Sequence, residues 1–139
     1  IKFLNYINNQ EHLGRHSIGD IYLDTFNYNG HTSIVDSLYS GLPVITKIGK
    51  SFSSRVGASL LNSFNMKNLI TKDTKQYENL ILELLKDRTK LSKIKEQVKI
   101  NISNSNLFNT KKYVSNLEKA FEIIVHNKLN DKKLENIEV

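Results

Sequence analysis

The residue types best suited to bind a charged ligand are concentrated in one short segment of the chain. They are Asn29, Gly30, His31, Thr32, Ser33 and Asp36. Asparagine and glycine tolerate left-handed backbone angles, so the chain can reverse direction sharply at the start of this segment. Thr32 or Ser33 can then cap a helix that ends at Gly41. A helix that begins directly after a strand presents free N–H groups and a positive dipole, and α/β proteins bind phosphates at such positions.

The expected helix, residues 32–40, has two chemically different faces. Apolar side chains on one face can pack on a sheet. They are Ile34, Val35 and Leu38. Thr32, Ser33 and Asp36 share the other face, with Thr32 and Asp36 one turn apart. Hydroxyls, exposed amides and a carboxylate one turn deeper suit a diphosphate joined to a ribose. On the local pattern alone, an ordinary capped helix with a solvated aspartate explains the same residues.

The strands and helices that must position this segment follow from hydrophobic periodicity. Short strands are expected at four places, which are residues 1–4, 21–25, 42–46 and 68–71. Helices are expected from residues 11, 32, 51 or 53, 73 or 74, 88 and 113, and the apolar stripes of the last three are expected to form core. The resulting fold class is α/β, a Rossmann-like parallel sheet with helices on both faces. We expect one compact lobe over residues 1–126 and a charged, frayed tail over 127–139.

Composition limits the possible functions of the 139 residues. The formal charge of +6 is a modest indication of an anionic ligand, although solvated lysine faces explain it equally well. A nucleic-acid partner is not expected, because no arginine stripe with interleaved aromatics is present. The absence of cysteine excludes disulfides and thiolate metal sites. No apolar run approaches the roughly 18 residues of a membrane span and no signal sequence is visible, so we expect a cytoplasmic protein without a membrane partner.

One long string resembles a known family. The resemblance is carried by LDTFNYNGHTSIVDSLYSGLPVITKIGKSFSSRVGASLL, and it extends upstream to Glu11–His16 and downstream to Asn106–Thr110. This string is similar to the C-terminal half of the O-linked N-acetylglucosaminyltransferase (SPINDLY-type) family. The resemblance implies that residues 1–126 are the nucleotide-sugar-binding, or donor-binding, C-terminal lobe of a two-lobed GT-B glycosyltransferase. Because the chain begins inside an expected strand, at Ile1, we expect it to be a piece of a longer protein.

The resemblance also implies a reaction and a set of contacts. N-acetylglucosamine would pass from UDP-N-acetylglucosamine to a Ser or Thr hydroxyl of a protein acceptor, with inversion and with neither a cofactor nor a catalytic metal. The segment from Asn29 to Asp36 would bind the nucleotide sugar, His12 would lie against the uracil ring and Arg15 near the nucleotide pocket. No catalytic residue is assignable here, because the acceptor site and a lysine that assists the leaving phosphate belong to an upstream lobe. Tetratricopeptide repeats are expected further upstream, and the chain alone is expected to be inactive.

Some positions depart from the family pattern or allow a second interpretation. Asn9 replaces a common lysine near the base, and Ile48-Gly49-Lys50 replaces a frequent Pro-Gly-Glu. Gly49-Lys50-Ser51 is no phosphate-binding P-loop, because Val44 occupies the required earlier glycine position. Arg55 can neutralise phosphates or form a structural ion pair. Two alternative functions stay open: transfer from another nucleotide sugar, such as GDP-fucose or UDP-glucose, and a nucleotide-binding module that transfers nothing.

Overall fold

The computed structural model describes residues 2–133 and 135–139. Its centre is a three-stranded parallel sheet of order β1-β2-β3. The strands are β1 (Tyr22–Leu23), β2 (Val44–Lys47) and β3 (Ile70–Thr71). Tyr22 lies opposite Val44 in the first pair, and Thr46 lies opposite Ile70 in the second. The first three residues of β2 are completely buried, as is typical of the central strand of a parallel sheet covered on both faces.

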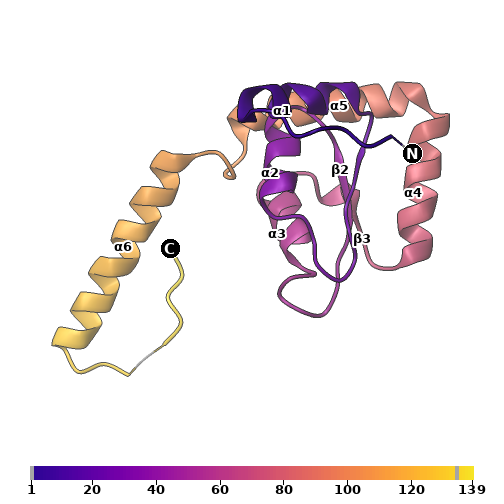
Figure 1. The fold of residues 1–139 in the computed structure, drawn as a ribbon. Coiled ribbons are helices and arrows are strands. Elements are labelled where there is room, and N and C mark those ends of the chain that lie inside the picture. Colours follow the sequence, from indigo (N-terminus) through magenta and orange to yellow (C-terminus); the bar gives the residue numbers. More distant parts are fainter. Residues whose placement is uncertain (1, 134) are drawn as a thin grey trace. The chain divides into compact units, whose positions relative to one another are not determined.

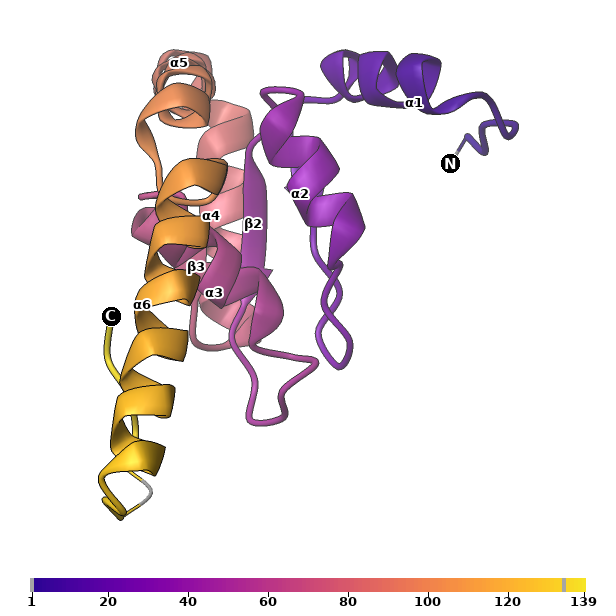
Figure 2. The same ribbon diagram turned by 90° about the vertical axis from the view of Figure 1, so that its left-hand side faces the viewer.

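Helices cover both faces of the sheet. Their bounds are α1 (Asn9–Arg15), η1 (His16–Ile18), α2 (Thr32–Tyr39), α3 (Val56–Ser63), η2 (Lys67–Leu69), α4 (Thr74–Lys86), α5 (Arg88–Asn104) and α6 (Thr110–Leu129). Figures 1 and 2 show α2 and α3 on one face of the sheet and α4 on the other. Helix α5 crosses one end of the sheet and contacts both α2 and α4. The predicted class, α/β with a Rossmann-like parallel sheet and helices on both faces, is therefore confirmed.

The expected strand over residues 1–4 is wrong for the part that the structure describes. Residues 2–4 have no regular structure and their side chains are exposed, with Phe3 91% accessible. Ile1 lies outside the described residues. A short apolar run becomes a strand only where a neighbouring strand accepts its hydrogen bonds, and β1 pairs with β2 alone.

The start of α3 also differs from the prediction. The helix begins at Val56, and its N-cap residue Arg55 makes no side-chain capping bond. Neither of the expected caps, Ser51 or Ser53, caps the helix. Ser51 is hydrogen-bonded to Ser54 through hydroxyl and backbone groups and closes a turn before α3, and the Ser53 hydroxyl donates to the Asn27 carbonyl at 3.1 Å. Serine hydroxyls commonly bond nearby backbone groups in this way, which makes turns and caps hard to distinguish in a sequence.

The apolar stripes expected on α4 and α5 form the core with α2 and α3, with exceptions at single positions. Leu85 was expected in the core and is 47% exposed, and Leu80, Ile81 and Ile102 are half-buried. The fully or almost fully buried members of these helices are Ile34, Leu38, Ala58, Leu61, Tyr77, Leu84, Leu91, Ile94 and Val98. Asp73 and Asp87 cap α4 and α5 by accepting hydrogen bonds from backbone amides three residues further on. Gly41 follows α2 with a φ of +82°, so the predicted glycine stop of that helix is confirmed.

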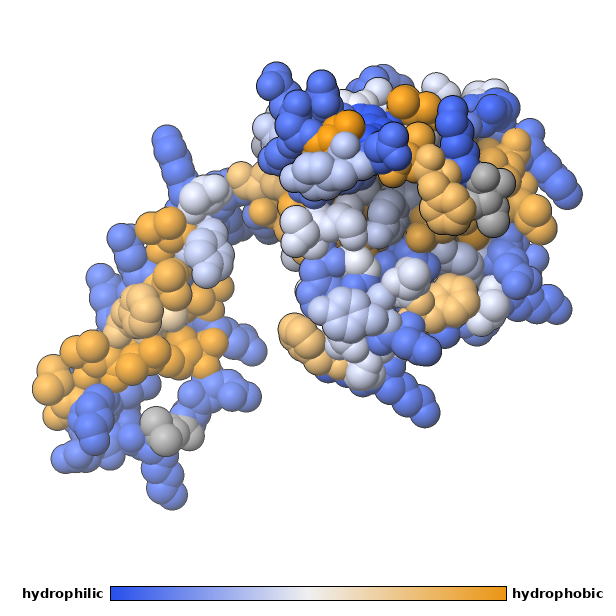
Figure 3. Space-filling view, viewed as in Figure 1, coloured by the Kyte–Doolittle hydropathy of each residue, from blue (hydrophilic) through white to orange (hydrophobic). Residues whose placement is uncertain are grey.

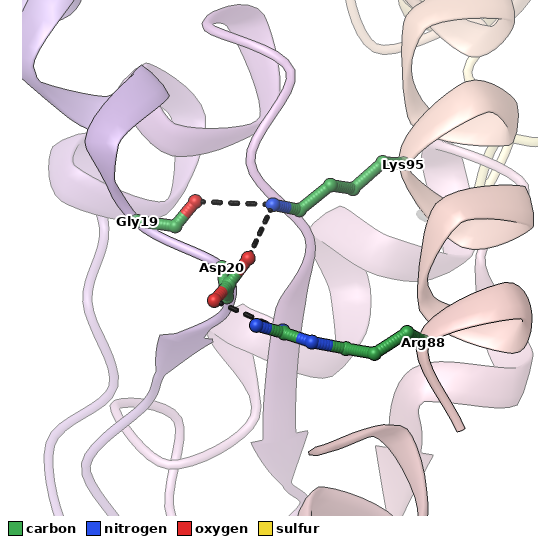
Figure 4. Close-up of polar contacts among 4 residues, drawn as sticks. All are labelled: Gly19, Asp20, Arg88 and Lys95. Carbon is green, nitrogen blue, oxygen red and sulfur yellow. Dashed lines mark hydrogen bonds and ion pairs between the residues drawn. The ribbon is translucent and has the colours of Figure 1, made fainter. Parts of the chain in front are cut away.

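An ion-pair cluster joins α5 to the residues before β1 (Figure 4). Lys95 Nζ lies 2.8 Å from Asp20 Oδ1 and 3.3 Å from the Gly19 carbonyl oxygen, and Arg88 donates to Asp20 Oδ2 at 3.1 Å. These hydrogen bonds, the one from Lys95 foremost, hold the pKa of Asp20 below its usual value. The Asp20 side chain is 48% exposed, so solvent screening keeps the contribution of the cluster to stability small.

The chain divides into two compact units, residues 1–105 and 106–139. The second unit holds α6, which Asn109 caps by accepting a hydrogen bond from the Lys112 amide at 3.0 Å. Helix α6 has no buried residue, so the expectation that its apolar stripe forms core is wrong within this chain. The stripe instead gives the helix an apolar surface, visible in Figure 3, that includes Tyr113, Leu117, Phe121 and Ile124. Amphipathic spacing identifies a face that can pack, but it does not supply the surface to pack against.

The expected division at residue 126 falls inside α6, which continues to Leu129. Residues 130–133 and 135–139 have no regular structure. Among the described residues, no helix combines the length and the apolar character needed to cross a membrane.

Candidate functional site

Asp24 holds the turn between β1 and α2 from inside the fold. This residue directly follows β1 and is only 4% exposed. Its Oδ1 accepts hydrogen bonds from the Thr25 amide at 2.9 Å and the Gly30 amide at 2.7 Å, and its Oδ2 accepts one from the Thr46 hydroxyl at 2.5 Å. The Thr25 hydroxyl also donates to the Tyr28 carbonyl, which closes the turn on itself.

Asn29 connects the same turn to α3. The residue is completely buried, and its Nδ2 donates to the Thr25 carbonyl at 2.7 Å. Its Oδ1 accepts a hydrogen bond of 3.1 Å from the amide of Gly57, the second residue of α3, and its own amide donates to the Ser53 carbonyl at 2.9 Å. Asn29 therefore caps α3 from a distant part of the chain. Of the predicted site residues, Asn29 and Gly30 have these polar groups directed into the protein.

The first turn of α2 differs from the expected capped helix. His31 is the N-cap residue and makes no side-chain capping bond, while Thr32 is the first helical residue and is exposed. Ser33 does not cap either, because its hydroxyl is hydrogen-bonded to the Tyr22 hydroxyl at 2.9 Å. The first amides of a helix have no partner within the helix. Without a side-chain cap, the amides that begin α2 are available to a ligand at the carboxyl edge of the sheet.

Two exposed aromatic rings flank His31. The Tyr28 ring is stacked on the imidazole at 4.9 Å between centroids, and the Phe52 ring meets it edge-on at 6.4 Å. Tyr28 is 66% exposed and Phe52 75% exposed. His31 Nε2 is buried and has no hydrogen-bond partner among the described residues. The loop that carries Phe52 and the turn that carries Tyr28 lie side by side, as Figure 2 shows and the hydrogen bond from the Asn29 amide to the Ser53 carbonyl requires.

A histidine that the sequence analysis did not select links Asp36 to His12. His16 lies in η1, where its ring meets the His12 ring at 4.9 Å with an angle of 73°. Burial and the neighbouring His12 lower the pKa of His16. Asp36 has the opposite effect on this pKa, but a smaller one. His16 therefore contacts the His12 ring directly, while Asp36 of α2 acts on His16 only through its charge. The only available sequence signal was the spacing of four between the two histidines, which places them on one face of a helical turn.

His12 and Arg15 line one cavity of about 480 Å³ together with Asn9 and residues 4–7. Arg15 also donates from Nη2 to the Asn5 carbonyl at 2.8 Å, so the segment before α1 is held over the helix. The structure thus brings His12 and Arg15 together on α1, and it places Thr32, Ser33 and Asp36 on α2. His16 lies beside His12, and the charge of Asp36 acts on its pKa, so His16 is near residues of both groups.

The loop before α3 does not form the ion pair considered for Arg55. The Arg55 guanidinium donates instead to the Lys50 carbonyl. Gly49 is pressed against Ser54, and its amide donates to the Ser54 carbonyl at 2.8 Å. A loop that cradles phosphate needs free backbone amides, and the Gly49 amide is already used in this bond. Among the described residues, no three His, Asp or Glu side chains gather as a metal site would need.

A parallel sheet with an uncapped helix at its carboxyl edge is the arrangement by which many α/β enzymes bind nucleotides. Comparison with known families makes the class specific: residues 1–117 match the profile described as Glycosyl transferase family 41. The chain belongs to this family, and the resemblance noted in the sequence is confirmed.

The chain spans only a small part of the length of the relatives that it matches. It is 35% identical to a probable UDP-N-acetylglucosamine–peptide N-acetylglucosaminyltransferase SPINDLY of Eustoma exaltatum. The match extends over 118 residues, which are 85% of this chain and 13% of the Eustoma protein. The Arabidopsis thaliana SPINDLY protein is 34% identical over 113 residues, 81% of this chain and 12% of the relative. A solved O-GlcNAc transferase mutant of Thermobaculum terrenum has the same fold, with a TM-score of 0.79 and 24% identity over 85% of this chain and 23% of that one.

Proposed function

We propose that this chain is the UDP-sugar-binding part of a protein O-GlcNAc transferase, an enzyme that moves N-acetylglucosamine from UDP-N-acetylglucosamine to a Ser or Thr hydroxyl. The observation that carries the proposal is the N-terminus of α2. It lacks a side-chain cap, lies at the carboxyl edge of the sheet and has an aspartate one turn further along. These are the requirements for a diphosphate attached to a ribose.

The diphosphate would lie at the first amides of α2. A helix N-terminus carries a partial charge of roughly +0.5, and fixed dipoles of this kind stabilise charge without reorganising during the reaction. Negative charge grows on the departing UDP as the sugar bond breaks. Amides at Thr32 and Ser33, with the exposed Thr32 hydroxyl, would stabilise that charge, which supports an inverting transfer without a catalytic metal.

The nucleoside would extend along α2 toward α1. Asp36 would accept hydrogen bonds from the ribose hydroxyls, since a carboxylate beside a diphosphate otherwise only repels it. The base would enter the cavity lined by Asn9, His12 and Arg15. Figure 2 shows α1 near the end of α2 that lies away from the turn, so the proposed order of diphosphate, ribose and base follows the arrangement of the helices.

The remaining parts of the reaction would come from outside this chain. We propose an upstream lobe that supplies the acceptor site and the lysine at the leaving phosphate, with tetratricopeptide repeats beyond it. The acceptor would be a protein with a Ser or Thr hydroxyl, and the enzyme itself would be cytoplasmic. The chain spans 13% of the length of its Eustoma relative, so ample sequence exists in such proteins for these parts.

Titration calorimetry with UDP tests the proposal on wild type and on Asp36→Asn. The variant keeps the shape of the side chain but loses charge-assisted hydrogen bonds worth roughly 1.5–3 kcal/mol each, so UDP should bind about ten-fold more weakly or worse. Glu78→Gln is the matched control, because it removes an exposed acid from α4 on the other face of the sheet and should leave UDP binding unchanged.

Two results would count against the proposal. Unchanged or tighter UDP binding by a folded Asp36→Asn variant, with folding checked by circular dichroism, would make Asp36 a solvated surface acid. Tighter binding of GDP than of UDP by the wild type would replace the donor with a guanine nucleotide sugar such as GDP-fucose.

A further inference from the structure

Asp24 is a buried carboxylate, and no basic side chain bonds it among residues 2–133 and 135–139. Its two oxygens accept hydrogen bonds from two backbone amides and one hydroxyl, at 2.5–2.9 Å. Burying a charge in this way is costly unless its hydrogen bonds are well made. A negative group directly behind a turn that is proposed to receive a diphosphate is also unfavourable for the ligand. The retention of such a group calls for a function that offsets both effects.

Four other elements meet at Asp24. The turn contributes Gly30, β2 contributes Thr46, and the buried Tyr77 hydroxyl of α4 donates to the Asp24 carbonyl at 3.1 Å. Helix α3 contributes Gly57, where an added Cβ would lie 2.6 Å from Asp24 Oδ2. The carboxylate is therefore fixed by the turn, β2 and the close approach of α3, while Tyr77 holds the Asp24 backbone, so that the residue can act as a rigid reference for the turn.

The bond from the Gly30 amide to Asp24 sets the path by which the chain enters α2. Gly30 is followed by the N-cap residue His31, and the amides after it are those that the proposed diphosphate needs. Several amides bind one anion well only when their directions are fixed beforehand, because ordering them at the moment of binding costs entropy. A glycine not held in this way has unusually wide conformational freedom.

We propose that Asp24 is a positioning residue of the nucleotide-sugar site: it holds the Gly30 amide and thereby orients the uncapped amides of α2 toward the diphosphate. This assignment rests on the proposed function and adds a residue that does not itself touch the ligand. It depends on the accepting oxygen rather than on the charge, because the charge opposes an anionic ligand.

The test separates phosphate contacts from nucleoside contacts. UDP and uridine, which lacks the diphosphate, are titrated by NMR into wild type, Asp24→Ala and Asp24→Asn. Asp24→Ala should weaken UDP by about ten-fold or more while uridine changes by less than about two-fold, since only the phosphate subsite loses its orientation. Asp24→Asn should restore most of the UDP affinity, because its amide oxygen can still accept from Gly30 while its NH2 group faces a Thr46 hydroxyl able to rotate and accept.

Tyr77→Phe is the matched control. It removes the hydrogen bond to the Asp24 carbonyl without touching the carboxylate, so it should lower the melting temperature and leave the ratio of UDP to uridine affinity unchanged. A purely structural Asp24 would give a different pattern: the Ala variant would then lose UDP and uridine binding in equal measure, or Tyr77→Phe would change the ratio as much as Asp24→Ala. Equal effects of Asn and Ala would assign the role to charge. Each of these three results overturns the inference.

Amide hydrogen exchange supplies a readout that does not depend on the Ala variant folding. In wild type the Gly30 amide should exchange slowly, and UDP should shift the Thr32 and Ser33 amide resonances more than that of Gly30. A Gly30 amide that exchanges as fast as an open loop overturns the assignment. Failure of the proposed function is distinguishable, because wild type would then bind no UDP at all, and the positioning role would fall with it.

Discussion

Side chains in the turn before α2 and in the first turns of α2 are of two kinds: some bond the protein interior and others face the surface. Asn29 uses both ends of its amide group on backbone partners inside the fold. Thr32 is exposed, and Asp36 is half-buried on the same helix. Affinity for a ligand therefore depends on two sets of residues, one that makes contacts and one that fixes the geometry of the contacts. The following predictions address single members of these sets.

His12→Ala tests the proposed base contact. A base stacked on an aromatic ring contributes roughly 1–3 kcal/mol, so loss of the imidazole should weaken UDP by that amount. Pyrophosphate, which has no base, should bind equally well before and after the change. Calorimetric titration with both ligands provides the comparison, and an equal loss for both would assign His12 to the phosphates or to folding.

The phenol of Tyr77 should make the free energy of unfolding depend on pH in the alkaline range. Burial, with smaller contributions from Asp24 and Tyr22, raises the pKa of Tyr77 from 10.0 to about 12. Between these two values the unfolded chain has lost the phenolic proton and the folded chain still holds it. Stability should therefore be unaffected below pH 10 and fall as pH rises from about 10 to about 12. Urea unfolding across this range should show a flatter decline for Tyr77→Phe, and an identical decline in both proteins would contradict the prediction.

At the scale of elements, α3 depends on a cap supplied by a distant residue. Asn29→Ala leaves the Gly57 amide and the Thr25 carbonyl without their side-chain partner in a buried place. Loss of a cap and of a second buried hydrogen bond should lower the free energy of unfolding by about 2 kcal/mol or more. Urea unfolding measures the loss. Asn27→Ala, two residues earlier on the exposed part of the turn, should change it by no more than about 0.5 kcal/mol.

The strength of the sequence signal differed between elements for physical reasons. Leu84, Leu91, Ile94 and Val98 are buried as their periodic spacing indicated, because these helices have a partner surface within the chain. Phe121 follows the same periodicity on α6 and is exposed. Periodicity reports an apolar face but carries no information about which surface covers it. Phe3 shows the same limit for strands, since an apolar run without a pairing partner stays irregular.

The candidate site was predictable where its signal was local. Thr32 and Asp36 are one turn apart on a helix whose start the turn residues already marked, so spacing alone placed them on one face. Asp24 was not predictable in this way, because its function depends on Thr46 and Gly57, which reach it only through the fold. The electrostatic influence of Asp36 on the pKa of His16 likewise depends on how the fold brings α2 and η1 together. Long-range hydrogen bonds leave no periodic trace in a sequence.

At the scale of the whole molecule, the family similarity and the two units do not end at the same place. The family profile covers residues 1–117, and the first unit ends at residue 105. The donor contacts proposed here all lie in the first unit. These proposed contacts include no group that would activate an acceptor hydroxyl, so we expect donor binding and sugar transfer to be separable in this chain.

We therefore expect the 139-residue chain to bind UDP and to transfer no sugar. Transfer requires a base for the acceptor hydroxyl and a cation at the leaving phosphate, held within bonding distance of the donor at the same time. The proposed site offers amides, a ribose carboxylate and a base cavity, which stabilise the donor but do not activate an acceptor. Incubation with radiolabelled UDP-N-acetylglucosamine and Ser- or Thr-containing peptides should give background counts, while calorimetry on the same preparation detects UDP. Turnover above background that disappears in Thr32→Ala would show that this chain contains the catalytic groups itself.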